Sequence, residues 1–271
     1  MDRILDICDK YGLTMVEDCA HTLGTRWRGR HMGSFGAAAA WSCEQKMLGA
    51  AEAGFVTTDD EYLAAKVIIA AGAYDDLFET HLSKPPREYF ERVRYTTPHF
   101  SMRMSSLAAA LIRPQLTRLD ERIARYQHHY ATLEESLPSE QFATLLQHDA
   151  VSTSVLHFLQ FYPVGFERHA QALRFVDECA RRGVWVECMG ATGKPWDCRA
   201  WRYGGIRRAK LPQTEANTLF LIDVKLPLEF EEHNIRQLAE VLIAARREVL
   251  LDDRETASAT AACSSRASTS T

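Results

Sequence analysis

The sequence predicts an α/β protein in which a mostly parallel sheet is followed by a smaller α+β domain. Short apolar runs alternate with amphipathic helical runs over residues 1–103, which is typical of a sheet covered by helices. Apolar residues over 104–137 recur at alternating spacings of three and four, so this segment is predicted to be one long helix. A second set of strands and helices over 138–251 predicts the smaller domain.

The first segment is expected to supply the larger sheet. In chain order, its predicted elements are a helix over 2–11, a strand over 13–18, a Gly-rich hairpin over 24–36, strands over 37–43 and 53–58, and a helix over 62–72. Gly12 ends the first helix, and Thr58 with Glu61 fits a capping box that opens the last one. Residues 73–103 show no clear periodicity, so they are expected to form a long loop.

The long helix carries a continuous apolar stripe and is followed by the second domain. The stripe consists of Leu116, Leu119, Ile123, Tyr126, Tyr130, Leu133 and Leu137, and Pro114 is expected to kink the helix. Later elements are predicted as a strand over 155–164, a helix over 167–181, strands over 183–189 and 217–224, and a helix over 230–250. The Ser/Thr/Ala-rich residues 252–271 are expected to be disordered.

Composition argues against several classes of protein. The chain has 46% hydrophobic and 25% charged residues, and its net charge of -4 gives no basic footprint for nucleic acid. No apolar run approaches the ~20 residues that span a bilayer, so no membrane association is expected. The seven cysteines contain no C-x-x-C pair. Neither a disulfide framework nor a metal site is therefore expected, and the predicted compartment is the reducing cytoplasm.

Three polar side chains lie near the ends of predicted strands. Asp18 and Ser42 each end a strand, and Lys46 follows Ser42 by four residues. Ligands of α/β sheets bind beyond the carboxyl ends of the strands, so these side chains are expected to share a crevice. A lysine for a Schiff base, a carboxylate for the ring nitrogen and a hydroxyl for the phosphate are what a pyridoxal phosphate site requires. Taken singly, each residue also fits an ordinary role in a turn or on the surface.

Ordered motifs give a family resemblance. The stretch "VEDCAHTLGTRWRGRHMGSFG", followed by "WSCEQKMLGAAEAGFVTTDDEYLAAK", resembles the DegT/DnrJ/StrS family of pyridoxal-phosphate-dependent sugar aminotransferases. The stretch "HFSMRMSSLAAALIRPQLTRLDERIARYQ" resembles the family's N-x-R-M-S…A-A…Q-L…L-D…R segment, and "RRGVWVECM" resembles part of its small domain. The resemblance covers residues 1 to about 250.

The resemblance implies an aspartate-aminotransferase-like fold, PLP fold type I. Residues 1–103 would be the C-terminal part of the large cofactor-binding domain, 104–137 the connecting helix, 138–251 the small α+β domain and 252–271 a disordered tail. The family works as a homodimer, so a homodimer is expected here as well.

The resemblance also implies an activity and roles for single residues. An amino group would pass from glutamate or glutamine to a keto-sugar or keto-cyclitol, with pyridoxal 5'-phosphate held by Lys46 in a Schiff base. Lys46 would also move the proton of the reaction. Asp18 would pair with the pyridine nitrogen, His21 would lie near the ring, and Ser42 would contact the phosphate. Arg103 would lie near a neighbouring subunit's site and is a candidate for substrate binding.

Departures from the family pattern support an alternative. The run from Gly36 to Lys46 is one residue shorter, the G-E-G-G turn reads A-E-A-G at 51–54, and Ser101 replaces an asparagine. The family also has a large N-terminal segment, with a phosphate-binding loop, before the position of residue 1. The alternative is an incomplete or non-catalytic homologue. It would act as a structural partner, or as a subunit of a split enzyme whose separate chain supplies the N-terminal half.

A basic and aromatic cluster, "KPWDCRAWRYGGIRRAK" at 194–210, falls where the family's substrate-proximal region lies. Arg199 and Arg202 are the candidates for binding the phosphates of a nucleotide-sugar or sugar phosphate, with Trp196 or Trp201 stacking on a ring. A solvated loop of arginines is the alternative interpretation.

Overall fold

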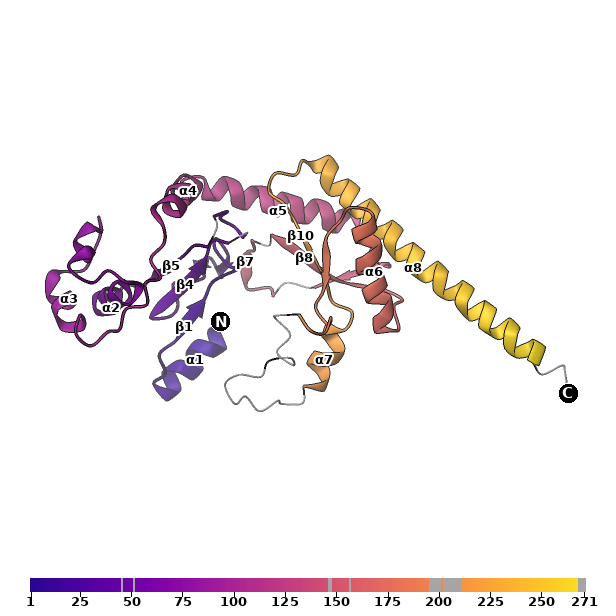
Figure 1. Cartoon of the computed structure of the whole chain (residues 1–271), viewed down its shortest axis with the longest axis horizontal. Helices are drawn as coiled ribbons and strands as arrows, with labels where there is room; N and C mark the ends of the chain where they lie inside the picture. The colour runs from indigo at the N-terminus through magenta and orange to yellow at the C-terminus, as the bar shows by residue number, and fades with distance from the viewer. Residues whose placement is uncertain are drawn as a thin grey trace. The chain divides into compact units, whose positions relative to one another are not determined.

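The computed structural model describes residues 1–44, 46–50, 52–145, 148–155, 157–194, 201 and 211–267, with side chains described as far as 252 (Figure 1). The chain divides into two compact units. Unit 1 comprises Met1–Gln127 and Gln147–Leu156, and unit 2 comprises His128–Leu146 and His157–Thr271. The predicted connecting helix is thus shared between the units, and a later segment returns to unit 1.

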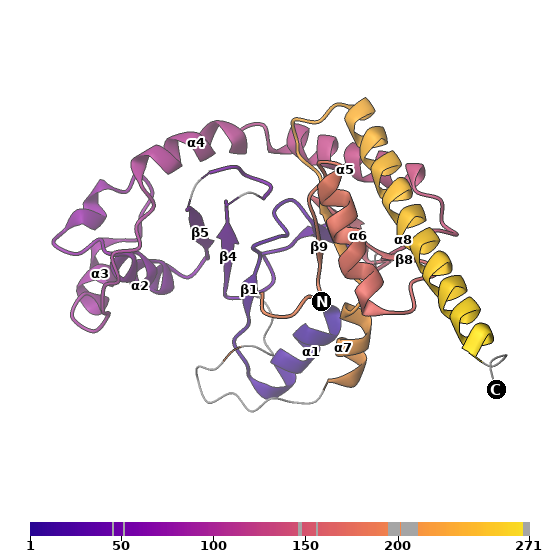
Figure 2. The same ribbon diagram turned by 45° about the vertical axis from the view of Figure 1, so that its right-hand side comes forward.

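Unit 1 is built on a three-stranded sheet with the order β1–β4–β5 (Figure 2). β1 (Val16–Asp18) is parallel to β4 (Ala38–Ser42), and β4 is antiparallel to β5 (Gly54–Thr57). A mostly parallel sheet was predicted, and the described strands give one ladder of each kind. α1 (Asp2–Tyr11) precedes β1 and ends at Gly12, whose φ of 60° is a left-handed conformation that glycine adopts at low cost.

A hairpin and a distant strand form a second small sheet in unit 1. β2 (Arg26–Trp27) and β3 (Arg30–His31) are joined by Arg28 and Gly29, which both have positive φ, 48° and 81°. Two positive φ angles match the strand twist in a two-residue hairpin, so the predicted hairpin is confirmed. β7 (Val151–Thr153) pairs with the other edge of β2, a pairing that no local pattern indicated.

The N-cap of α2 (Glu61–Ala71) is not the predicted residue. Asp60 is the N-cap, and its Oδ1 accepts a hydrogen bond from the Leu63 backbone N–H at 3.0 Å. Thr58 instead donates its hydroxyl hydrogen to the Ala37 carbonyl at 2.6 Å. The predicted capping box was wrong because the helix starts two residues later, where aspartate is an equally good cap.

The segment expected to be a long loop contains two short helices, η1 (Leu77–Thr80) and α3 (Arg87–Val93). Phe78 and Phe90 are both at most 1% exposed, and their rings stack with centroids 4.0 Å apart. With Ile69 of α2 they form a separate small core. Each helix is too short to show a helical period of apolar residues, so no helix could be predicted here.

The predicted long helix is two helices, α4 (Ser106–Leu116) and α5 (Leu119–Ser136). Pro114 lies within the last turn of α4, where its missing N–H removes a helical hydrogen bond. Part of the apolar stripe is buried by the chain itself, because Tyr126, Leu133 and Leu137 are at most 5% exposed, while Leu116 is 41% exposed. Those three residues of the stripe therefore belong to the core.

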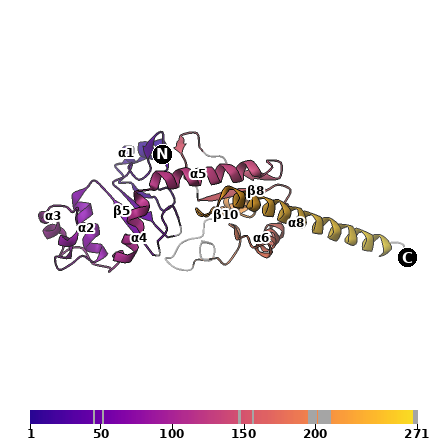
Figure 3. The same ribbon diagram turned by 90° about the horizontal axis from the view of Figure 1, so that it is seen from above.

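Unit 2 contains a four-stranded antiparallel sheet that packs with several helices, among them the C-terminal part of α5. The strand order is β6–β8–β10–β9, and α6 packs along α8 (Figure 3). The elements are β6 (Phe142–Thr144), β8 (Phe158–Pro163), α6 (His169–Arg181), β9 (Val186–Cys188), α7 (Pro212–Thr218), β10 (Ile222–Lys225) and α8 (Glu232–Ala267). The sequence predicted β8, α6, β9, β10 and α8 and missed β6 and α7.

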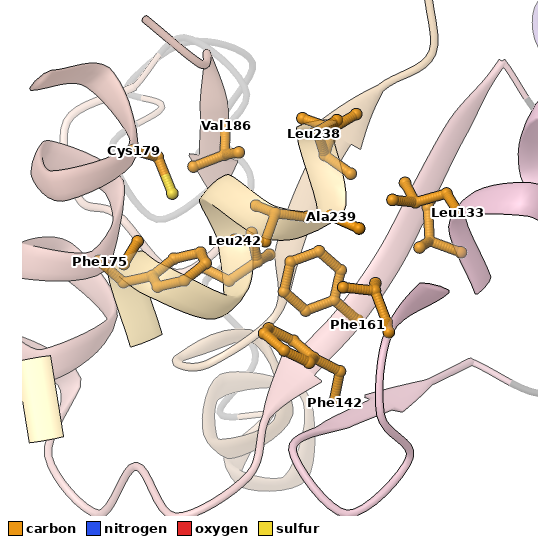
Figure 4. Close-up of a cluster of buried hydrophobic side chains, with 14 of the residues drawn as sticks. Leu133, Phe142, Phe161, Phe175, Cys179, Val186, Leu238, Ala239 and Leu242 are labelled. Atoms are coloured by element: carbon orange, nitrogen blue, oxygen red, sulfur yellow. The ribbon is translucent and has the colours of Figure 1, made fainter. Parts of the chain in front are cut away.

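One face of this sheet and the two long helices enclose the core of unit 2 (Figure 4). Phe161 lies at its centre and meets the edges of two other rings, Phe142 at a centroid distance of 5.3 Å and Phe175 at 6.2 Å. Leu242 of α8 is fully buried against the same cluster. Alternation along β6 and β8 directs Phe142 and Phe161 inward, as the sequence pattern requires.

α8 extends further than the sequence indicated. A disordered tail was predicted from Asp252, whereas the backbone stays helical as far as Ala267. The segment holds five alanines between Glu255 and Ala267 and no glycine or proline, so its backbone propensity favours helix even though it lacks bulky apolar residues.

Asp223 is a half-buried carboxyl group of β10 in unit 2, and its pKa is expected to make stability depend on pH. Burial raises the pKa of its carboxyl group, a hydrogen bond from Gln160 at 3.1 Å opposes that rise, and the charge of Glu187 on the adjacent strand adds to it. The folded chain therefore holds this proton to a higher pH than the unfolded chain does. The stability that this group contributes is complete at low pH and is lost as the pH rises through its folded pKa.

Replacing Asp223 with asparagine should raise the free energy of unfolding at neutral pH by on the order of 1 kcal/mol. It should also flatten the decline in stability above the ordinary aspartate pKa. Urea unfolding at several pH values measures both effects. Glu187→Gln on the facing strand is the matched comparison, and a wild-type pH profile in Asp223→Asn would contradict the prediction.

Candidate functional site

The register of the unit 1 sheet places Asp18 and Ser42 on one face. Asp18 is paired with Ala40 across the parallel ladder, and Ser42 follows Ala40 by two residues in β4. Side chains two apart in a strand point the same way, so both polar groups project from the carboxyl ends of β1 and β4 on the same side. Asp18 is exposed, and its Oδ1 accepts a hydrogen bond from the Ala20 backbone N–H at 3.0 Å.

Lys46 lies in the loop between β4 and β5 and turns back to the end of β4. Its Nζ donates a hydrogen bond to Ser42 Oγ at 2.9 Å, so the amine and the hydroxyl meet directly. Both side chains are half-buried. Burial raises the pKa of the neighbouring Cys43 thiol, while the Lys46 charge opposes that rise. The structure thus joins Lys46 to the sheet face that carries Asp18.

The other predicted residues of unit 1 border this region. His21 is exposed in the turn after β1, where the Thr22 backbone N–H donates to the Cys19 carbonyl at 3.2 Å. Arg103 is exposed and lines a cavity of about 300 Å³ together with Ser42. The remaining lining residues are Glu44, Glu52, Ala53, Gly54, Met102 and Met104.

The candidates in the basic cluster have a different outcome. Arg199 and Arg202 lie outside the described residues, as do Trp196, Arg207 and Arg208. Trp201 is described and is 39% exposed. The assignment of this cluster to substrate binding therefore stays a prediction from the sequence.

Glu17 is an important residue that the sequence reasoning missed. Alternation along β1 directs it to the opposite face from Asp18, where it is only 6% exposed. Its carboxylate accepts three backbone hydrogen bonds from the G-S-F-G loop, from Gly33 at 2.7 Å, Phe35 at 2.6 Å and Gly36 at 2.8 Å. An acidic residue at an inward position of a buried strand was the available signal, since such a charge needs partners.

Glu17→Gln should lower the free energy of unfolding by about 2–3 kcal/mol, because an amide would place N–H groups against backbone donors that now bind a carboxylate. Thermal and urea unfolding measure the loss. Asp18→Asn is the matched control next to it in the strand, and its exposed side chain should cost less than about 1 kcal/mol. Equal losses in the two variants would show that the loop does not depend on Glu17.

The A-E-A-G turn keeps one glycine where the backbone requires it. A Cβ on Gly54 would lie 2.6 Å from the Trp41 carbonyl oxygen of β4. The left-handed conformation in this turn falls on Glu52, with φ of 40°, so Ala53 escapes it. The alanine at 53 is therefore tolerated, while Gly54 allows β5 to pair closely with the strand that carries Ser42.

Over the described ranges of the chain, no helix combines the length and apolar character needed to cross a bilayer. In the same residues, no group of three or more His, Cys, Asp or Glu side chains is arranged to bind a metal ion.

Comparisons with known proteins identify a family. The model of the DegT/DnrJ/EryC1/StrS aminotransferase family matches residues 1–187. The chain is 32% identical over 138 residues to GDP-perosamine synthase of Caulobacter vibrioides, and 34% identical over 143 residues to the spore coat polysaccharide biosynthesis protein SpsC of Bacillus subtilis. Each alignment spans 51% of this chain but only 34% and 36% of the relative, about a third of its length.

A solved structure shares the fold. The structure of DesI with its TDP-sugar product superposes with a TM-score of 0.69 at 23% identity. The match covers 94% of this chain and 61% of DesI. The similarity extends over both units of the chain and supports the predicted aspartate-aminotransferase-like fold class.

Proposed function

The chain belongs to the DegT/DnrJ/EryC1/StrS aminotransferase family, and on that basis we propose that it carries the lysine half of a pyridoxal-phosphate-dependent sugar aminotransferase site. The reaction would transfer an amino group from glutamate or glutamine to a keto-sugar or keto-cyclitol. The observation that carries the proposal is the contact between Lys46 and Ser42 on the sheet face that bears Asp18.

The donor set fits the cofactor group by group. When bound, pyridoxal phosphate would supply an electron sink for the carbon that loses a proton. Lys46 Nζ would hold it covalently and then move that proton. The Asp18 carboxylate, oriented by the Ala20 N–H, would keep a proton on the ring nitrogen, with His21 close to the ring. Ser42 accepts from Lys46, so its own hydroxyl hydrogen stays available for a phosphate oxygen.

Covalent trapping tests the proposal. The purified chain is mixed with pyridoxal phosphate, the visible absorbance is recorded, and borohydride is added to fix any cofactor attached to a lysine. Peptide mapping should find the label on Lys46. Labelling spread over exposed lysines such as Lys10 and Lys66, with none at Lys46, would overturn the assignment.

We infer that the sugar substrate is a nucleotide-sugar. GDP-perosamine synthase has a GDP-sugar in its name, and DesI was solved with a TDP-sugar product, so both relatives support this class. Arg103 shares a cavity with Ser42 and supplies a cation for a phosphate or carboxylate group there. Arg199 and Arg202 are proposed from sequence alone as further phosphate contacts.

We also propose that the site is completed by further protein surface. α1 buries none of its side chains, and among the described strands β1 pairs on one side only, with β4. Ile4 and Ile7 of α1 are each 51% exposed and Val16 of β1 is 65% exposed. An additional segment of the large domain, on this or a separate polypeptide, would cover these apolar groups and bring a phosphate-binding loop.

A homodimer is the proposed assembly. Phe100, Met102, Leu107 and Leu111 of unit 1 are 49–73% exposed and flank Arg103, which gives apolar surface beside the proposed site. The cytoplasm is the proposed compartment, because five cysteines in the described part of the chain are free thiols: Cys8, Cys19, Cys43, Cys179 and Cys188.

Cofactor uptake with and without added protein tests completion of the site. The chain alone and the chain co-expressed with a polypeptide carrying a glycine-rich phosphate loop are compared for cofactor affinity and mass. Uptake only in the complex identifies a split enzyme. Absence of uptake in both preparations would favour the alternative of a non-catalytic structural partner.

A further inference from the structure

We propose that Gln115 and Arg122 are positioning residues that hold the backbone carrying Lys46. Residues 46–50, called the Lys46 loop below, belong to no helix or strand, although they carry the side chain on which the site depends. Side chains from α4 and α5 fix this loop through its peptide groups. The inference rests on the proposed function only for the chemistry of Lys46, because the contacts themselves lie within unit 1.

Gln115 makes the most specific of these contacts. Its Oε1 accepts from the Gly49 backbone N–H at 2.8 Å, and its Nε2 donates to the Gly49 carbonyl at 2.8 Å. Nε2 also donates to the Leu111 carbonyl at 2.8 Å, which fixes the amide to its own helix. One primary amide thus satisfies both polar groups of a loop residue, which a carboxylate or an alkyl side chain does not do.

α5 supplies two further contacts on the adjacent residues of the loop. Arg122 Nε donates to the Met47 carbonyl at 3.0 Å, and Tyr126 Oη donates to the Lys46 carbonyl at 3.4 Å. The Arg122 bond is the shorter and carries a full charge, so it is the stronger of the two. The carbonyl groups of residues 46, 47 and 49 are therefore all held by side chains of α4 and α5.

Apolar packing fixes the underside of the loop but leaves its rotation to these hydrogen bonds. Leu48 is fully buried and packs with Cys43, Ala50 and Ile112. The Ala50 N–H donates to the Cys43 carbonyl at 2.9 Å and closes the base of the loop. Met47 is also buried, at 4% exposed, but hydrophobic burial is not directional. The orientation of Lys46 Nζ toward Ser42 thus depends on the backbone contacts made by Gln115 and Arg122.

These contacts explain two polar positions in the "PQLTRLDER" stretch that the site itself does not use. Gln115 of α4 and Arg122 of α5 lie on either side of the short break between the helices, and both contact the Lys46 loop. Arg118, between them in sequence, instead pairs with Glu121 at 2.7 Å in an exposed ion pair. Arg118 therefore provides a matched control.

Acetylation of Lys46 in the cofactor-free protein tests the inference. The variants are Gln115→Glu, which sets a carboxylate against the Gly49 carbonyl, and Arg122→Gln, with Arg118→Gln as the control. Each full-length protein is treated briefly with acetic anhydride, and mass spectrometry gives the labelling rate of Lys46 relative to exposed Lys66 on α2. Loss of one loop contact should raise the relative rate about fivefold in both variants. Arg118→Gln should stay within about twofold of wild type.

A purely structural role would give a different result. It would lower the unfolding temperature of the Gln115 and Arg122 variants but leave the acetylation rate of Lys46 relative to Lys66 unchanged below that temperature. An unchanged relative rate would overturn the inference. If Gln115→Glu does not fold, Arg122→Gln decides the question alone. A second readout is the pH midpoint of the visible absorbance after adding pyridoxal phosphate, which should move in the two variants and not in the control. Failure of wild type to take up cofactor, both alone and with the added polypeptide, would reject the proposed function but not the acetylation result.

Discussion

Lys46→Ala should abolish covalent cofactor attachment and reduce amino transfer by about 10³-fold or more, because one amine serves as both attachment point and proton carrier. The substitution removes a half-buried side chain that donates a 2.9 Å hydrogen bond to Ser42, so folding should change little. The rate is measured with glutamate and a keto nucleotide-sugar, in whichever preparation of wild type shows activity. Circular dichroism confirms that the variant is folded.

Lys66→Ala gives the matched control for this experiment. Lys66 is an exposed lysine of α2, and its ammonium lies 6.0 Å from the centre of the Tyr62 ring. Its loss should leave the rate within about twofold of wild type, as for most surface substitutions. A Lys46→Ala protein that kept a tenth or more of the wild-type rate, roughly 1.4 kcal/mol of barrier, would remove Lys46 from the reaction.

Gly54→Ala should destabilise unit 1 by about 1–3 kcal/mol, the range typical of overpacking. The new Cβ would lie 2.6 Å from the Trp41 carbonyl oxygen, and backbone does not move aside as a flexible side chain does. Gly54 is paired with Ser42, so separation of β5 from β4 would also displace the hydroxyl that meets Lys46. Urea unfolding measures the loss, and borohydride trapping reports the displacement.

Gly49→Ala tests whether this effect is specific to position. A Cβ on Gly49 would meet only Gln115 Oε1, at an ordinary distance of 3.8 Å. The variant should therefore change the free energy of unfolding by less than about 1 kcal/mol. Similar losses in the two glycine variants would show that the close approach of Gly54 to β4 does not limit stability.

The sequence predicted those parts of the fold that are encoded locally. α1 was predicted with its bounds because amphipathic period and Gly12 agree, and β1, β4 and β5 followed from short apolar runs. α3 was missed because its period is too short to read, and β7 because its partner is the distant strand β2. Local patterns carry no information on such long-range pairings.

The candidate site was predicted in part for the same reason. Asp18, Ser42 and Lys46 stand at strand ends, where chemistry is expected, and their side chains need only the register of one ladder to share a face. Glu17 and Gln115 act on backbone groups of other segments, which the sequence does not connect to them. Residues that hold a site in place are harder to predict from sequence than those that form it. Their partners are backbone peptide groups, which are alike at every position and leave no sequence pattern.

The position of β7 has a consequence for how the chain folds during synthesis. The Arg28 N–H donates to the Ala150 carbonyl at 2.7 Å, and the Gly29 N–H donates to Ser152 Oγ at 2.8 Å. Residues near the start of unit 1 can therefore make these bonds only after more than a hundred further residues have been synthesised. β6, the first strand of unit 2, is synthesised before β7. Pairings of such high sequence separation form slowly. Nascent unit 1 therefore passes through a period with an open β2 edge, in which binding by a chaperone would protect the chain from misassembly.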